Sequence, residues 1–122
     1  LKSSIAIGDE VVSVGSPLGA PLKLSTDGRI KDINERIFTY TLDLFGGNSG
    51  SPIFSTKSNA VVGVHTFGSA LSLYHDPVNE CKRYNTCLDT EGQFACVQKG
   101  GLAGGTPLES LPAYIKKNYQ VQ

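Results

Sequence analysis

The chain has 122 residues, which suffices for one domain with one hydrophobic core. Its 11 basic and 11 acidic residues balance, so no excess positive charge is available to bind a nucleic acid or an anionic membrane. The apolar runs, such as residues 60–64, are as long as a strand and far shorter than the roughly 20 residues that cross a bilayer. The sequence begins at Leu1 without an initiating Met, and we expect it to be a piece of a longer chain.

Short segments rich in β-branched residues dominate the first two thirds of the chain. Residues 9–14 predict a first strand that ends at the turn-rich stretch 15–19. Residues 22–33 predict a second strand with a bulge or bend at residues 26–28. The apolar positions of this second strand are Leu22, Leu24, Ile30 and Ile33.

Three further strands are predicted before residue 68. Residues 37–43 alternate regularly, which places Phe38, Tyr40 and Leu42 on one face of a strand. Residues 51–54 and 60–67 flank a hairpin turn at 57–59. About six short strands joined by tight turns predict an all-β fold, a small six-stranded antiparallel barrel spanning the whole chain, residues 1–122.

The last third of the chain breaks this pattern. Residues 69–105 are too many for an ordinary loop, and we expect an insertion that a covalent link stabilises. Its glycine-rich end, 99–105, is equally compatible with a returning strand and with a flexible linker. A C-terminal α-helix is predicted over residues 110–119, with Ser110 as its N-cap.

The three cysteines lie in this insertion. Cys81, Cys87 and Cys96 have a spacing that matches no common zinc pattern, so no metal site and no cofactor are expected. We expect a disulfide between two of them, which leaves the third free or paired elsewhere. A disulfide implies an oxidising compartment, so the predicted location is secreted or periplasmic.

One stretch, GGNSGSP at residues 46–52, has the composition that a nucleophilic serine needs. Such a serine sits on a tight turn so that its oxygen projects away from the backbone, and neighbouring N–H groups converge to stabilise an oxyanion. Glycines on both sides permit this backbone because they tolerate positive φ. The alternative is a Gly/Ser loop between two strands without catalytic function. We predict that Ser49 is a nucleophile.

This stretch, preceded by Asp43, Leu44 and Phe45, resembles the nucleophile motif of bacterial trypsin-like serine peptidases, especially the glutamyl-endopeptidase branch. The resemblance extends downstream to residues 61–68 and upstream to the turn at 14–19, and it covers roughly two thirds of the chain. The cysteine-containing insertion is the poorest match. The resemblance implies the C-terminal half of a chymotrypsin-like double barrel.

The resemblance also implies roles for individual residues. Ser49 would attack the scissile carbonyl, and the N–H groups of Gly47 and Ser49 would form the oxyanion hole. The strand with His65, Thr66, Phe67 and Gly68 would bind the substrate, with Gly68 pairing to its main chain.

The general-base histidine and its aspartate belong, in this family, to an N-terminal barrel. Of the two histidines present, His65 corresponds to the specificity pocket and His75 is expected at the surface. The chain alone is therefore expected to be inactive, and to dimerise or bind its other half through an exposed apolar face.

Two residues suggest opposite specificities. Asp43 stands six residues before Ser49, where trypsin-like enzymes place a carboxylate for Arg or Lys. His65 stands where glutamyl endopeptidases bind an acidic side chain, but Leu44 replaces the threonine that assists that histidine. Alternatively, Asp43 satisfies loop donors and His65 is a core residue bonded to a neighbour such as Asp43. The sequence leaves basic, acidic and neutral specificity open.

Three functions remain compatible with the sequence. The first is a serine endopeptidase that acts on protein or peptide substrates. The second is a protease-like binding module that has lost catalysis and keeps its pocket for recognition. The third is an esterase, because ester hydrolysis uses the same serine chemistry.

Overall fold

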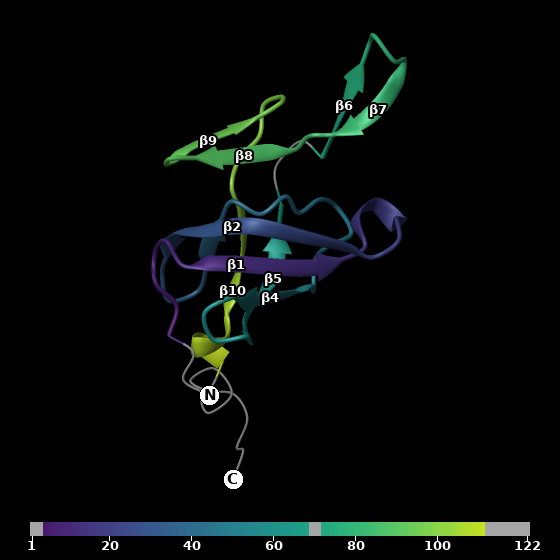
Figure 1. The fold of residues 1–122 in the computed structure, drawn as a ribbon. Helices are drawn as coiled ribbons and strands as arrows, with labels where there is room; N and C mark the ends of the chain where they lie inside the picture. Colours follow the sequence, from purple (N-terminus) through teal and green to yellow (C-terminus); the bar gives the residue numbers. More distant parts are fainter. Residues whose placement is uncertain (1–3, 69–71, 112–122) are drawn as a thin grey trace.

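The computed structural model describes residues 4–68 and 72–111, and these form a closed antiparallel barrel with two additional hairpins (Figure 1). The strands of the barrel follow one another in the order β1-β2-β3-β10-β5-β4. Their bounds are β1 (Glu10–Gly15), β2 (Lys23–Ile33), β3 (Phe38–Tyr40), β4 (Pro52–Ser55), β5 (Ala60–Phe67) and β10 (Ala103–Pro107). The predicted six-stranded antiparallel barrel is confirmed. No helix within the described ranges is long and apolar enough to cross a bilayer.

The predicted bulge in β2 is present and changes which side chains face the core. Val11 of β1 pairs with Gly28, whereas Ser13 pairs with Ser25, so β2 carries one extra residue in between. After this bulge Ile30 is buried, but the two leucines before it are exposed: Leu22 at 72 % and Leu24 at 65 %. The buried apolar side chain of this strand therefore lies in its second half.

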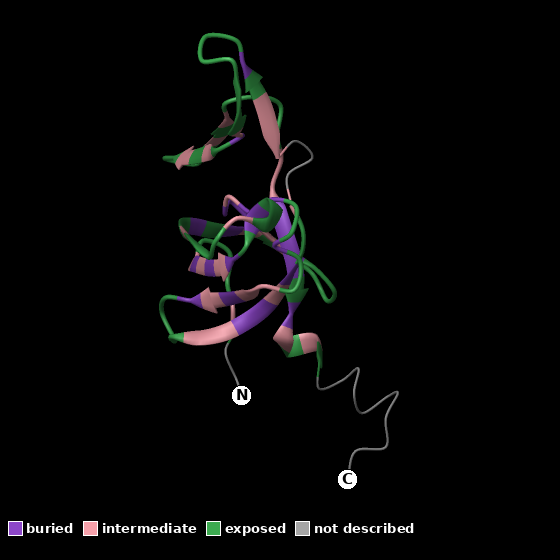
Figure 2. Cartoon of the chain, turned by 90° about the vertical axis from the view of Figure 1, so that its right-hand side faces the viewer, coloured by how far each residue is buried: buried purple, intermediate pink, exposed green. Residues whose placement is uncertain are grey.

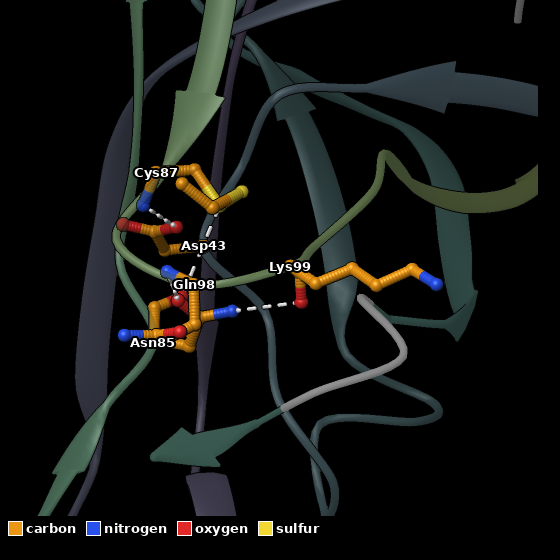
Figure 3. Close-up of a disulfide and its surroundings, with 6 residues drawn as sticks. Asp43, Asn85, Cys87, Gln98 and Lys99 are labelled. Atoms are coloured by element: carbon orange, nitrogen blue, oxygen red, sulfur yellow. Dashed lines mark hydrogen bonds between the residues drawn. A yellow bond between two sulfur atoms is a disulfide. The ribbon is translucent and has the colours of Figure 1, made fainter. Parts of the chain in front are cut away.

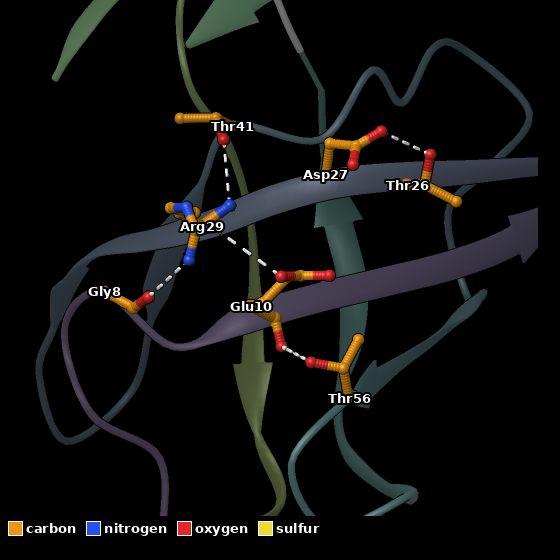
Figure 4. Close-up of polar contacts among 7 residues, drawn as sticks. All are labelled: Gly8, Glu10, Thr26, Asp27, Arg29, Thr41 and Thr56. Carbon is orange, nitrogen blue, oxygen red and sulfur yellow. Dashed lines mark hydrogen bonds and ion pairs between the residues drawn. The ribbon is translucent and has the colours of Figure 1, made fainter. Parts of the chain in front are cut away.

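β3 is shorter than predicted because the chain leaves the sheet after Tyr40. The backbone N–H of Arg29 donates to Thr41 Oγ1 at 2.9 Å, and the Thr41 N–H donates to the Arg29 carbonyl at 3.1 Å (Figure 4). Thr41 is consequently buried, although the alternation places it on the outer face. The predicted inner face is confirmed, since Phe38, Tyr40 and Leu42 all lie in the core.

Every strand of the barrel contributes side chains to the core, and the glycine-rich β10 contributes a single alanine. Its buried members are Val11, Ile30, Phe38, Tyr40, Leu42, Leu44, Ile53, Val62 and Ala103. β10 can pass close to its neighbours because Gly104 has no side chain. A side chain there would overlap the ring of Phe67. The strand interpretation of the glycine-rich stretch is confirmed for residues 103–105, and the linker interpretation is wrong there.

The insertion folds into two hairpins at the end of the barrel opposite the short turn of residues 108–110 (Figures 1 and 2). One pairs β6 (Leu73–Asp76) with β7 (Cys81–Tyr84), and the other pairs β8 (Cys87–Thr90) with β9 (Gln93–Cys96). A disulfide joins Cys87 to Cys96 across the second hairpin, and Cys81 is free and exposed. The expected covalent link within the insertion is confirmed.

The predicted C-terminal helix lies mostly outside the described residues. A single 3₁₀ turn, η2 (Leu108–Ser110), follows β10. Ser110 is the last residue of this turn, and its hydroxyl donates to the Pro107 carbonyl at 2.7 Å. Leu111, the last described residue, has helical backbone angles, and the rest of the predicted helix lies outside the described residues.

An ion pair fixes the second hairpin to the barrel. Lys31 Nζ lies 2.6 Å from Asp89 Oδ2, and the Asp89 side chain is only 6 % exposed. We expect Lys31→Ala to lower the free energy of unfolding by roughly 3 kcal/mol, because it leaves a buried carboxylate unpaired. Urea denaturation measures this loss. The matched control is Arg29→Ala, whose pair with Glu10 is largely exposed at 3.6 Å and is worth less than about 1 kcal/mol. Equal losses in the two variants would contradict the prediction.

Candidate active site

Ser49 lies at the surface in a pair of tight turns between β3 and β4. We call these turns, residues 46–50, the serine turn. The Asn48 N–H donates to the Phe45 carbonyl at 3.0 Å, and the Ser51 N–H donates to the Asn48 carbonyl at 3.0 Å. Gly47 and Gly50 adopt φ angles of 94° and 92°, which favour glycine. The sequence therefore places Ser49 in a conformation that few other residue combinations would allow.

A second turn, residues 15–19, supports the serine turn from one side. It contains η1 (Pro17–Gly19), and the N–H of Leu18 donates to the Gly46 carbonyl at 2.7 Å. A β-carbon on Gly47 would lie 2.9 Å from the Ser16 carbonyl oxygen, so the two turns are in direct contact. A side chain at Gly15 would overlap the buried Asn48 side chain. The sequence signals the presence of this turn but not its contact with residues 46–48.

Strand β5 holds the serine turn from the other side. The Gly50 N–H donates to the His65 carbonyl at 2.8 Å, and the His65 N–H donates to the Ser51 carbonyl at 2.9 Å. The Ser49 hydroxyl is 3.5 Å from the Thr66 carbonyl oxygen, a weak contact that leaves Oγ exposed beside the end of β5. Ser49 and the strand predicted to bind substrate are thus neighbours.

The imidazole of His65 points into the barrel. It is 1 % exposed, and Nδ1 lies 2.8 Å from the hydroxyl of Tyr40. Burial lowers the pKa of His65, opposed by a hydrogen bond with the Gly104 backbone, and burial raises the pKa of Tyr40. His65 is therefore bonded to a neighbour in the core, but that neighbour is Tyr40 and not Asp43.

The buried imidazole predicts an acid-sensitive fold. The pKa of His65 is below its ordinary value of 6.5 in the folded chain, so the unfolded chain binds its proton first. We expect stability to be lost as the pH falls below 6.5, and His65→Gln to reduce this loss. Urea denaturation at several pH values from neutral to mildly acidic measures it. The matched control is Ser58→Ala, an exposed residue without an ionisable side chain, which should keep the wild-type pH dependence. An unchanged pH dependence in His65→Gln would refute the assignment.

Asp43 lies in a cleft of about 630 Å³ between the barrel and the β8–β9 hairpin. Its Oδ1 accepts the N–H of Cys87 at 2.8 Å (Figure 3). Burial raises the pKa of Asp43, and the hydrogen bond from Cys87 opposes this shift. The cleft is also lined by Asp27 and Asp89.

The structure does not bring all the predicted substrate-binding residues to this cleft. Asp43 lines it, whereas His65, Thr66, Phe67 and Gly68 do not. Gly68 instead packs on the carbonyl of Leu44, and Thr66 and Phe67 are exposed at the end of β5 beside Ser49. Within the part of the chain that the structure describes, no three His, Cys, Asp or Glu side chains are grouped as metal ligands.

The sequence profile of the family described as trypsin-like peptidase domain matches residues 1–64. The matched segment begins before β1, contains the whole serine turn and ends in β5. The match covers more than half of the chain. The all-β barrel of the chain, and the position of Ser49 between Gly47 and Gly50 with their positive φ angles, agree with the match. The chain therefore belongs to the trypsin-like peptidase domain family.

Proposed function

We propose that this chain is the nucleophile-bearing part of a serine endopeptidase, which hydrolyses peptide bonds through an acyl-enzyme on Ser49. The observation that carries the proposal is the serine turn. It exposes Ser49 Oγ beside β5, while positive φ angles at Gly47 and Gly50 and contacts from two neighbouring segments fix the backbone around it.

In the proposed mechanism, Ser49 Oγ attacks the scissile carbonyl carbon and its proton passes to a histidine base. The carbonyl oxygen becomes an oxyanion that accepts hydrogen bonds from the N–H groups of Gly47 and Ser49. The amine leaves with the proton, and water then hydrolyses the ester that remains on Ser49. The substrate main chain would run along the exposed end of β5, from Thr66 through Phe67 to Gly68.

The base and its aspartate would come from an N-terminal barrel of the same enzyme. His65 cannot serve in its present position, since it is buried and bonded to Tyr40, and His75 lies in β6 of the first hairpin. Exposed leucines on η1 and the start of β2 support an apolar docking face for that barrel or for a second copy. They are Leu18 at 47 %, Leu22 at 72 % and Leu24 at 65 %.

Basic specificity fits this chain better than acidic specificity. The cleft contains the half-buried carboxylate of Asp43, which favours a guanidinium or ammonium group. Acidic specificity would require His65 to leave Tyr40 and become exposed. The disulfide supports a secreted or periplasmic location, because disulfides persist in oxidising compartments.

A second candidate function is a binding module without catalysis. The orientation of both histidines favours it, because within the described residues neither imidazole is hydrogen-bonded to Ser49: that of His65 is bonded to Tyr40 in the core, and His75 lies in β6. Such a module would keep the cleft and the exposed end of β5 for recognition.

Covalent labelling distinguishes the two functions. The proposed complete enzyme, this chain together with its N-terminal barrel, is treated with a fluorophosphonate, which phosphonylates activated serines with loss of fluoride. It is then digested for mass spectrometry. The endopeptidase predicts one adduct, on the peptide that contains Ser49, and no adduct in Ser49→Ala. The matched control is Ser58→Ala, in the exposed turn between β4 and β5, which should label like the wild type. A folded protein without an adduct on Ser49 would favour the binding module.

A further inference from the structure

The two chain segments at the base of the β8–β9 hairpin, residues 85–87 and 96–99, are linked by a disulfide and by hydrogen bonds. We call these two segments the neck. Cys87 and Cys96 face each other in the hairpin register and are joined by the disulfide. Just below them the Val97 N–H donates to the Thr86 carbonyl at 3.1 Å. Asn85, which is fully buried, accepts the Gln98 N–H at 2.8 Å and donates to the Lys99 carbonyl at 3.4 Å (Figure 3).

The backbone N–H of Cys87, in this neck, lies at the cleft. The N–H of Cys87 points at the carboxylate of Asp43, which belongs to the segment leading to Ser49. Within the described residues it is the one group hydrogen-bonded to that carboxylate. The bond occupies Oδ1 and leaves Oδ2 available to a ligand.

The other charged groups of the cleft are less available. Asp89 is paired with Lys31, and Asp27 Oδ2 accepts the hydroxyl of Thr26 at 2.7 Å. The cation among the lining residues is Lys23, which is exposed at the start of β2. Asp43 is therefore the half-buried carboxylate of the cleft without a cationic partner, and the cleft has room for a side chain.

We propose that the disulfide-linked β8–β9 hairpin is a specificity-determining element, in which Cys87 positions the Asp43 carboxylate for the basic side chain of a peptide ligand. This inference rests on the proposed function for its ligand. The disulfide fixes the Cys87 amide, the amide fixes Oδ1, and Oδ2 is held toward the cleft for an ammonium or guanidinium group. Cys87 is thus a positioning residue, which acts through Asp43 and does not contact the ligand.

The positioning step can be measured without any ligand. In ¹⁵N-labelled full chain, the Cys87 amide proton should shift with pH as the Asp43 carboxylate titrates, because the two are hydrogen-bonded. Asp43→Asn should abolish this titration. In Cys87→Ser/Cys96→Ser the amide of residue 87 should no longer follow Asp43, while the amides of the barrel strands keep their wild-type shifts. The matched control is Cys81→Ser, which removes the free exposed cysteine and should behave as the wild type.

The specificity step uses p-aminobenzamidine, an aromatic amidine whose fluorescence reports binding. We expect the double cysteine variant and Asp43→Asn to bind it at least about tenfold more weakly than the wild type and Cys81→Ser. Reduction of Cys81→Ser with a phosphine reductant, which converts the disulfide to two thiols and is itself oxidised to the phosphine oxide, should weaken binding to the same extent. The double variant should not respond to the reductant.

The possible outcomes test the role of the hairpin separately from the proposed function. An amide at residue 87 that still follows Asp43 without the disulfide would overturn the positioning role of the disulfide. Loss of that coupling with undiminished amidine binding would overturn the specificity role. If the wild type does not bind the amidine at all, the proposed basic specificity fails, and with it the ligand assigned here, whereas the amide titration still decides the positioning.

Discussion

Replacing Ser49 by alanine is expected to lower kcat/KM for peptide hydrolysis by at least about 10⁴-fold in the complete peptidase. The loss is large because, in the proposed mechanism, the Ser49 hydroxyl is the attacking group and carries the acyl-enzyme. The fold should be unaffected, since Ser49 is exposed and its hydroxyl makes a single weak contact, 3.5 Å from the Thr66 carbonyl oxygen.

Steady-state kinetics with chromogenic peptide amides measure this loss, and urea denaturation verifies the fold. Ser58→Ala serves again as the control at an exposed serine, and its kcat/KM should equal that of the wild type. If Ser49→Ala retained a substantial part of the activity, the nucleophile would be another residue and the proposed mechanism would be wrong.

Replacing Gly47 by alanine is expected to lower kcat by about 10²- to 10³-fold, which is the effect of losing one oxyanion-hole donor. A β-carbon there would lie 2.9 Å from the Ser16 carbonyl oxygen and 3.0 Å from the Leu18 nitrogen, both backbone atoms. The φ of 94° is also unfavourable for alanine. The turn must therefore move, and the N–H of residue 47 moves with it.

Two neighbouring glycines provide matched controls for this clash. Gly50 has a similar φ of 92°, but a β-carbon there would meet nothing within 4 Å, so Gly50→Ala tests backbone strain alone. A β-carbon on Gly46 would meet the flexible end of Leu18 at 3.4 Å, so Gly46→Ala tests a mild contact. We expect both to lose much less activity than Gly47→Ala. Equal losses at Gly47 and Gly50 would assign the effect to strain and not to the contact with residues 16–18.

The barrel could be predicted because its strands carry local signals. The hairpin turn at 57–59 predicted where β5 begins, and the observed strand has the predicted limits, residues 60–67. Residues 26–28 predicted the bulge in β2. β3 was predicted too long because its end depends on a hydrogen bond between Thr41 and Arg29, which are distant in sequence. The first three strands of the insertion, β6, β7 and β8, were not predicted, since their short polar segments lack a clear apolar alternation.

The serine turn was predictable for the same reason, because glycine and serine at fixed positions determine its backbone. Its surroundings were not, since they consist of long-range contacts without a local signal. The contact of Gly47 with Ser16, the bond between His65 and Tyr40, and the bond from Cys87 to Asp43 all join residues 25 to 44 positions apart. The roles of Ser49, Gly47 and Asp43 stay predictions until they are measured.

The most direct test of the central claim is a crystal structure of the complete peptidase inhibited by a peptide phosphonate. The account predicts a covalent bond between Ser49 Oγ and phosphorus, with one phosphonyl oxygen within hydrogen-bond distance of the N–H groups of both Gly47 and Ser49. A bond to another residue, or an oxygen that neither amide contacts, would contradict it.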